Sequence, residues 1–199
     1  MVSHIAPPSG APAGTHDLSA GLYPRLLAAE WGNLDPAVQG LHAHGAAGAI
    51  EIRHGSTRLA RLLLRIMRMP PTAPAVWTRL DILHCHGGER WVRWFGDHVV
   101  ATLQREQTGR LLAERFGALE FYFRLRVADG ALHYEQTGTA LCLGPWRVPL
   151  PRRMAPRVSA QEAPTGRDRT HVLVSVTMPM AGFLISYEGG MELQAPGSR

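Results

Sequence analysis

Three charged residues stand among apolar and aromatic neighbours, where they could carry out acid–base chemistry. Arg93 lies in the run Trp-Val-Arg-Trp-Phe, and Glu114 and Arg115 lie in the run Leu-Leu-Ala-Glu-Arg-Phe. An arginine can orient a carbonyl or enolate oxygen, and an apolar cavity raises the pKa of a carboxyl group into the range that suits a general acid or base. We therefore predict Arg93, Glu114 and Arg115 as catalytic residues, with His98 as a further candidate for proton transfer.

The same charges also have a purely structural interpretation. A charge inside a protein must be paired or solvated by a bound polar group. Arg93 and Glu114 could therefore form a buried ion pair that only supports the fold, and both interpretations stay open.

Aromatic residues surround these charges along the sequence. Most of them are expected to belong to a hydrophobic core, but some are expected to line a cavity for a flat or apolar ligand. The residues predicted to contact such a ligand are Trp77, Trp91, Trp94, Phe95, Phe121, Phe123, Trp146 and Tyr187.

The sequence motifs give little support for a metal site or a cofactor site. His84-Cys85-His86 places two histidines on one strand face, and a third ligand from His98 or His133 would be needed to hold a metal. His86 precedes two glycines, where its side chain is expected to be exposed, so we predict no metal site. The sequence has no nucleotide-binding fingerprint, nucleophile elbow or phosphate loop. We therefore predict no cofactor, and neither a hydrolase nor a kinase.

A series of antiparallel strands is expected to position these residues. Apolar and polar side chains alternate through much of the stretch 76–137, and glycine-containing turns interrupt it at short intervals. Only the first third of the chain has helical patterns. We predict an α+β fold that is mostly β, an antiparallel barrel or strongly curved sheet of about 9–10 strands with N-terminal helices.

The strongest helical pattern covers residues 58–69. Its apolar stripe consists of Leu59, Leu62, Leu63, Ile66 and Met67, and its basic face of Arg58, Arg61, Arg65 and Arg68. We expect an amphipathic helix that closes one end of the barrel and exposes its basic face to solvent. A basic amphipathic helix can also lie on an anionic membrane, and this second interpretation stays open.

The length and composition are those of one domain. The chain has 199 residues, of which 45% are hydrophobic, enough to bury a single core. We predict a disordered tail at 1–15, one barrel-like domain at 16–193 and a second tail at 194–199. The segment 144–157, rich in proline and arginine, is expected to be a loop packed against the barrel mouth, or a docking surface for a partner.

The net charge and the cysteines limit which partners and which cellular location we expect. The net charge of +5 comes from arginine alone, because the chain has no lysine. The arginines are spread over many strands, so we predict no nucleic-acid partner. No apolar run approaches the roughly 20 residues of a membrane span, and the first residues do not form a signal peptide. Because nothing pairs Cys85 with Cys142, we expect a cytoplasmic protein with free thiols.

Several short motifs, in this order and spacing, resemble a known family. They are Leu22 to Leu27, Glu89 to Gly96, Glu114 to Gly117, Pro149 to Pro151, Pro156, and Gly182 with Tyr187 to Gly189. Over roughly residues 20–193 the chain is similar to an uncharacterised bacterial family catalogued as domain of unknown function 4166. Such domains are often attached to, or encoded near, a saccharopine-dehydrogenase-like NAD(P)-binding unit. The resemblance thus implies small-molecule metabolism, with an NAD(P)-dependent oxidoreductase as a candidate partner.

These observations favour a small-molecule enzyme of bacterial metabolism, secondary metabolism included. It would fold an apolar substrate in its pocket and catalyse cyclisation or isomerisation without a cofactor, by shape and general acid–base help. The alternative is a non-catalytic module that binds an apolar ligand or docks onto an oxidoreductase. A homodimer stays open for either function.

Overall fold

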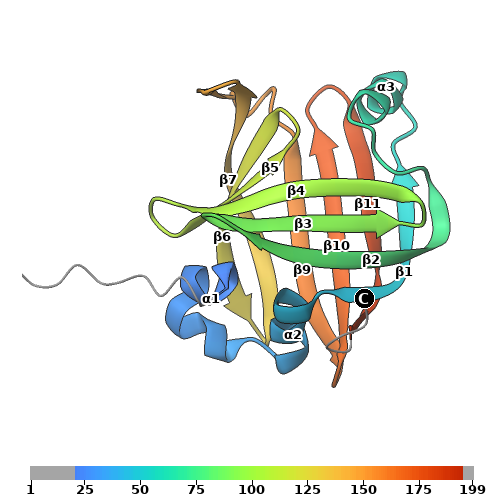
Figure 1. Cartoon of the computed structure of the whole chain (residues 1–199). Helices are drawn as coiled ribbons and strands as arrows, with labels where there is room; N and C mark the ends of the chain where they lie inside the picture. The colour runs from blue at the N-terminus through green and yellow to red at the C-terminus, as the bar shows by residue number, and fades with distance from the viewer. Residues whose placement is uncertain (1–20, 195–199) are drawn as a thin grey trace, which may run out of the picture.

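The strands of this protein close into an antiparallel barrel (Figure 1). The computed structural model describes residues 21–194, so the predicted tails at 1–15 and 194–199, except Gln194, lie outside the described residues. The eleven strands run in the order β6-β5-β4-β3-β2-β1-β11-β10-β9-β7-β8, and a β6–β7 pairing closes the circuit. Strand β8 pairs only with β7, which leaves ten strands in the barrel. The predicted mostly-β barrel with N-terminal helices is confirmed.

The strand bounds are as follows. They are β1 (Ala46–His54), β2 (Ala73–Cys85), β3 (Gly88–Phe95), β4 (His98–Gln107), β5 (Leu111–Phe116), β6 (Leu119–Ala128), β7 (Ala131–Leu143), β8 (Trp146–Pro149), β9 (Arg157–Gly166), β10 (Arg169–Met178) and β11 (Gly182–Leu193).

The period-two pattern decides which side chains face the interior. On β6, Phe121, Phe123 and Leu125 are buried while Arg124 and Arg126 are exposed, because successive side chains of a strand point to opposite faces. Tight turns join neighbouring strands. The β6–β7 turn has positive φ at both Asp129 (51°) and Gly130 (74°), as a two-residue hairpin of right-handed twist requires.

Three N-terminal helices cover one end of the barrel, which we call the closed end. They are α1 (Leu22–Leu27), the 3-10 helix η1 (Ala28–Asn33) and α2 (Pro36–His44), drawn in blue in Figure 1. Asp35 caps α2, since its side chain accepts a hydrogen bond from Ala37 N at 2.9 Å. Its backbone N–H donates to Gly130 O at 3.0 Å, which ties α2 to the β6–β7 turn.

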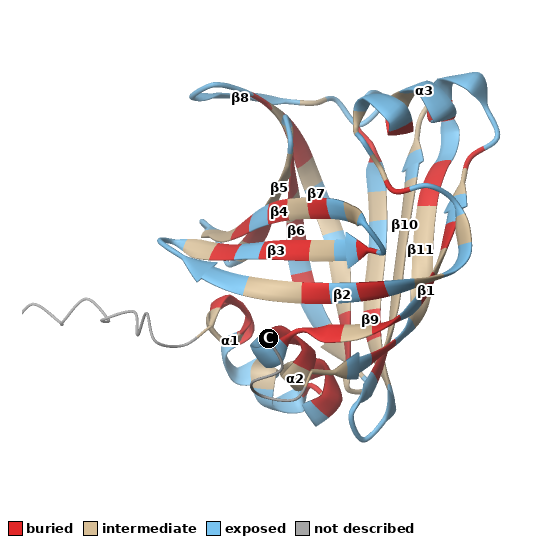
Figure 2. Ribbon diagram, turned by 45° about the vertical axis from the view of Figure 1, so that its right-hand side comes forward, coloured by how far each residue is buried: buried red, intermediate tan, exposed pale blue. Residues whose placement is uncertain are grey.

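Helix α3 (Arg58–Ile66) lies at the opposite end, which we call the open end. Thr57 caps it by accepting a hydrogen bond from Ala60 N at 3.1 Å. The helix is shorter than the predicted 58–69. Ala60 and Leu64 are its buried residues, and Leu63 and Met67 of the predicted apolar stripe are partly buried. Ala60 is small enough to let the helix approach the barrel closely. Most of the apolar stripe therefore stays exposed, as the pale blue of α3 shows in Figure 2.

The segment 144–157 differs from the expected loop. Strand β8 forms within it and pairs with the end of β7. Trp146, Val148 and Met154 are exposed, so they do not pack against the barrel mouth as predicted. The segment contacts the barrel through Arg147, whose Nε donates to Glu120 Oε1 at 3.0 Å, and through Ala155 and Pro156, which are buried.

The last strand runs through two glycines that resemble a breaker in the sequence. Gly189 pairs with Ile50 and Gly190 with Ala49 in the β1–β11 ladder. A Cβ atom at Gly189 would stand 2.2 Å from Ala49 O, so glycine permits the close approach of the two strands.

Two further expectations concern the thiols and membrane helices. Cys85 is exposed and Cys142 is buried, and both are free, as expected. Among the helices of residues 21–194, none has the length and hydrophobicity to cross a bilayer.

Candidate functional site

A cavity of about 160 Å³ lies inside the barrel. It extends from Leu41 of α2 at the closed end to Met67 and Met69, which precede β2 at the open end. Apolar side chains from most strands form its wall. The few polar groups are therefore the features that would orient a ligand.

Arg93 is the cationic group of this wall. Its NH1 donates to Thr102 Oγ1 at 3.1 Å and its NH2 donates to Glu114 Oε1 at 3.3 Å. The guanidinium carbon lies 5.2 Å from the centre of the Trp91 ring, a cation–π contact. Burial by itself lowers the pKa of Arg93, but the charges of neighbouring groups, the Glu114 carboxylate among them, outweigh this penalty and raise the pKa. Arg93 therefore keeps its positive charge in the folded protein.

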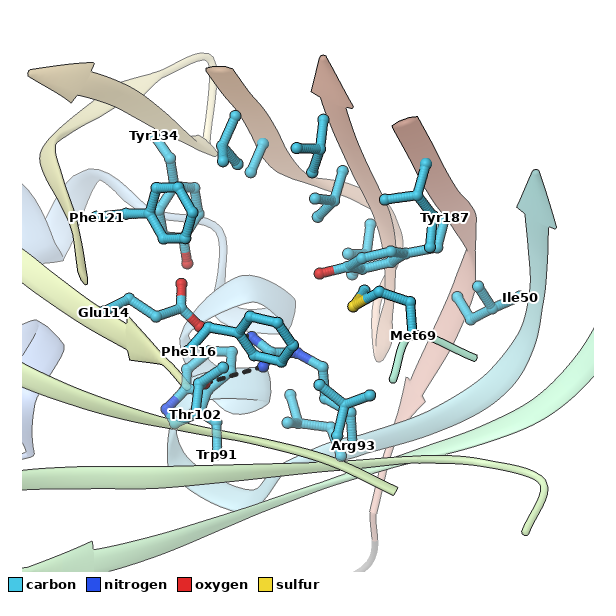
Figure 3. A pocket seen from close by; sticks show the side chains of 18 of the residues that line it. Ile50, Met69, Trp91, Arg93, Thr102, Glu114, Phe116, Phe121, Tyr134 and Tyr187 are labelled. Atoms are coloured by element: carbon cyan, nitrogen blue, oxygen red, sulfur yellow. Dashed lines mark hydrogen bonds and ion pairs between the residues drawn. The ribbon is translucent and has the colours of Figure 1, made fainter. Parts of the chain in front are cut away.

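The hydroxyls of Tyr187 and Tyr134 face the same hollow as Arg93 and Glu114 (Figure 3). Burial raises the pKa of Tyr187, against the lowering influence of Arg93. The Tyr187 ring packs edge-on against Phe95 with its centre 5.7 Å away, and within the described residues its hydroxyl has no hydrogen-bond partner. Tyr187 is thus a neutral donor that is free for a ligand oxygen.

Tyr134 belongs to a buried polar chain between the cavity and the closed end. Its hydroxyl donates to Glu162 Oε1 at 2.9 Å and lies 3.1 Å from the Tyr23 hydroxyl. Tyr23 in turn contacts Gln104 Oε1 at 2.9 Å, and His42 Nε2 lies 2.7 Å from Glu162 Oε2. Burial is the main cause that raises the pKa of both tyrosines well above the usual value. Such a connected network holds its members in fixed orientations.

Glu89, the first residue of the Glu89 to Gly96 motif, anchors α1 beneath the barrel. Its carboxylate accepts from Leu22 N at 2.7 Å and from Trp91 Nε1 at 3.2 Å. Its side chain is 2% exposed, so these contacts account for it as a structural residue.

Arg93, Glu114 and most of the predicted aromatic residues meet in the cavity. Arg93 and Glu114 come from β3 and β5, on either side of β4. The cavity wall also includes the predicted residues Trp91, Phe95, Phe121, Phe123 and Tyr187.

The other predicted site residues lie away from the cavity. Arg115 alternates with Glu114 and points outward, where its Nε donates to Gly117 O at 3.2 Å. His98 Nε2 lies 2.8 Å from Arg68 O at the strand end. Trp77, Trp94 and Trp146 are exposed. Adjacent strand residues have opposite directions, so proximity in sequence to Arg93 and Glu114 was no guide to the cavity.

Sequence reasoning missed Thr102, Tyr134 and Glu162. Tyr134 alternates with Leu132 on β7, so its inward direction could have been read from the period of two. Glu162 could not be joined to Tyr134 in this way, since their contact depends on the β7–β9 pairing.

Metal ligands do not gather anywhere in residues 21–194. No group of three His, Cys, Asp or Glu side chains there has the arrangement to hold an ion. His84, the first histidine of the candidate motif, is exposed and lies 3.9 Å from Glu89.

Comparison with known proteins identifies a family but no function. The family model described as Domain of unknown function (DUF4166) matches residues 34–191. A search of curated proteins returned no significant match. Among solved structures, a protein of unknown function from the DUF3598 family of Nostoc punctiforme matches with 12% identity and a TM-score of 0.43. The match covers 75% of this chain and 46% of the other, so this chain spans about half of that protein. This chain belongs to the DUF4166 family.

Proposed function

We propose that this DUF4166 domain binds an apolar small molecule with a carbonyl oxygen, which accepts hydrogen bonds from Arg93 and Tyr187. The observation that carries the proposal is the incomplete pairing of Arg93 inside an apolar cavity. A guanidinium has five N–H donors, and Thr102 and Glu114 accept from two of its nitrogens. The remaining donors and the Tyr187 hydroxyl are available to a ligand.

The charge balance favours a neutral ligand. Glu114 already compensates Arg93 at 3.3 Å. An anionic ligand would leave a net negative charge in an apolar site and a cationic ligand a net positive one, and either is costly. A ketone or similar carbonyl group needs only hydrogen-bond donors.

The size of the cavity limits how much of the ligand it can enclose. A cavity of about 150 Å³ holds one benzene molecule, and this cavity has about 160 Å³. One ring or a short chain fits beside Arg93, and a longer ligand would extend past Met67 and Met69 toward the open end.

A second candidate function is catalysis, which the position of Glu114 favours. With the carbonyl oxygen on Arg93 and Tyr187, the Glu114 carboxylate would remove a proton from the neighbouring carbon. The C–H electron pair would become a C=C bond, and the carbonyl π pair would move to the oxygen, where Arg93 and Tyr187 stabilise the enolate. In a β,γ-unsaturated ketone the resulting dienolate would take the proton back from Glu114 at its γ carbon, which completes an isomerisation. In a ligand with a second carbonyl group, the enolate carbon would attack that carbonyl carbon and the resulting alkoxide would take the proton from Glu114, which completes a cyclisation.

Binding and catalysis are tested in sequence. Native mass spectrometry of the purified chain identifies any bound ligand, and titration calorimetry compares 2-decanone, decanoate and decane. We expect the ketone to bind most tightly, and tighter binding of decanoate would overturn the carbonyl assignment. Deuterium exchange at the carbons next to the carbonyl then tests catalysis. Exchange that Glu114→Gln abolishes while 2-decanone still binds supports the enzyme, whereas no exchange by the wild type leaves binding alone.

Two partner predictions remain untested. An NAD(P)-dependent oxidoreductase, expected from the family resemblance, and a homodimer both stay predictions. The exposed segment 144–157 would be the docking surface for the oxidoreductase. Its replacement should abolish co-purification of such a partner.

A further inference from the structure

Helix α3 exposes the side on which a soluble amphipathic helix normally packs. Leu59, Leu62 and Ile66 are 41%, 54% and 68% exposed, while Ala60 and Leu64 make the contact with the barrel. These three apolar side chains lie one turn apart along the same helix. They form an apolar row along the helix at the open end, and no other part of residues 21–194 covers it.

The β10–β11 turn extends this apolar surface. Thr57 Oγ1 donates to Ala181 O at 3.0 Å, which fixes the turn beside the start of α3. Met180 in this turn is 94% exposed. We call Leu59, Leu62, Ile66 and Met180 the apolar strip. A projecting apolar group of this kind marks an interaction site more often than an isolated surface residue does.

Positive charges predominate around the apolar strip. Arg58, Arg61, Arg65 and Arg68 are exposed, and none forms an ion pair with another described residue. The sequence has no acidic residue from His54 to Thr78, and none from Leu143 to Gln161, the segment that forms the other side of the open end. That segment adds the exposed residues Arg147, Arg152, Arg153 and Arg157. Asp97 in the β3–β4 turn is the acidic residue next to this surface, since its neighbour His98 contacts Arg68 O.

We propose that the open end docks onto the surface of an anionic phospholipid bilayer. The apolar strip would enter the boundary between headgroups and acyl chains, and the α3 arginines would bind the lipid phosphates. Unpaired arginines beside exposed apolar side chains complement such a surface, which offers negative charge over an apolar layer. A second copy of this chain would bring like charges together, which disfavours self-association through this face.

The position of the surface gives docking a consequence for the cavity. Met67 follows α3 directly and lines the cavity, as does Leu64 of the helix itself. A bilayer at the open end would therefore face the route by which an apolar ligand reaches Arg93. Docking itself does not depend on the proposed ligand.

Vesicle co-sedimentation of the full chain tests docking. We expect binding to vesicles of equal parts phosphatidylcholine and phosphatidylglycerol, at least about tenfold weaker binding to pure phosphatidylcholine, and release by high salt. Leu62→Gln with Ile66→Gln should lose most binding, and so should Arg61→Gln with Arg65→Gln. The matched controls are Leu83→Gln with Leu103→Gln, and Arg90→Gln with Arg124→Gln, all at exposed positions outside α3.

Three outcomes would overturn the proposal. They are absence of wild-type binding to anionic vesicles, equal losses in the α3 and control variants, and a wild-type dimer that Leu62→Gln with Ile66→Gln dissociates in light scattering. Hydrogen exchange of the wild type provides a measurement that does not depend on variant folding: vesicles should protect α3 and not the β2–β3 hairpin. Arg93→Met should bind vesicles like the wild type, so failure of the proposed ligand site would be distinguishable from failure of docking.

Discussion

Arg93 and Glu114 face each other from strands β3 and β5, with Arg93 NH2 3.3 Å from Glu114 Oε1. Their side chains are 15% and 17% exposed, and the exposure is toward the cavity. The ion pair therefore supports the fold and lines the candidate site at once. The two interpretations that the sequence left open, a structural pair and a functional pair, do not exclude one another.

The first prediction concerns the stability that this pair contributes. Glu114→Gln leaves the Arg93 charge without its counter-charge, which should lower the free energy of unfolding by about 1–3 kcal/mol. Arg93→Met with Glu114→Gln removes both charges and should cost less than the sum of the two single changes, Arg93→Met and Glu114→Gln. Urea unfolding of the three variants measures this coupling. Strictly additive effects would mean that the contact contributes nothing.

The second prediction separates Arg93 from its neighbour in the motifs, Arg115. Arg93→Met should weaken 2-decanone binding by about tenfold or more, since loss of a hydrogen bond to a charged donor costs roughly 1.5–3 kcal/mol. Arg115→Gln should change it little, because the Arg115 side chain points outward to Gly117 O. Titration calorimetry measures both affinities. Equal losses would indicate a general effect on the fold.

The third prediction concerns Glu120, a buried carboxylate on the outer side of β6. It is 1% exposed and accepts hydrogen bonds from Arg105, Arg147 and Tyr122 at 2.6, 3.0 and 2.7 Å. Burial by itself raises its pKa, but the Tyr122 hydrogen bond and the two arginines outweigh this and lower the pKa. Its stabilising contribution is therefore complete above the pKa of the unfolded chain and is lost as the pH falls through the lower folded pKa.

Glu120→Gln should lower the free energy of unfolding by about 2 kcal/mol, because two guanidinium groups lose their counter-charge. It should also release β8, so trypsin should cut faster after Arg147, Arg152 or Arg153. The matched control is Glu135→Gln, whose ion pair with Arg126 is about half exposed and should contribute at most about 0.5 kcal/mol. A Glu120 variant as resistant to trypsin as the control would show that β8 is held by its backbone pairing alone.

The sequence predicted those features that depend on neighbours in the chain. Within the stretch 76–137, the alternating residues Leu119 to Val127 predicted the inward face of β6. The glycine-containing pairs Gly96-Asp97 and Asp129-Gly130 of the same stretch predicted turns that the structure has. Trp91, Arg93 and Glu114, which line the cavity, were predicted from short sequence motifs, which also depend only on neighbours in the chain.

Features that depend on distant pairing could not be predicted in the same way. Gly189 and Gly190 resemble a strand end, yet the pairing with β1 continues the strand to Leu193. The apolar stripe of α3 predicts a packed face, but Ala60 and Leu64 are the buried residues of this helix, while Leu59, Leu62 and Ile66 are exposed. Glu162 reaches Tyr134 only because β7, which pairs with β6 along one edge, pairs with β9 along the other.

The fourth prediction uses all four tyrosines of the chain. Burial is the main cause that raises the pKa of Tyr23, Tyr134 and Tyr187, and burial together with Glu120 raises the pKa of Tyr122 to about 12. A phenol in the unfolded chain ionises near pH 10. In the folded protein each phenol holds its proton more tightly, so this stabilisation is complete below about pH 10 and decreases as the pH rises toward the folded pKa values.

Absorbance titration of phenolate formation checks this prediction. The native chain should give no ionisation step near pH 10, and the chain in denaturant should give one for all tyrosines together. Tyr122→Phe should remove the first step of the native titration, since Tyr122 is the outermost tyrosine, bonded to Glu120 on the barrel exterior. Tyr187→Phe should leave that step in place. A native step near pH 10 that Tyr187→Phe removes would mean that the Tyr187 hydroxyl is open to water, and a carbonyl ligand would then have to displace water to reach it.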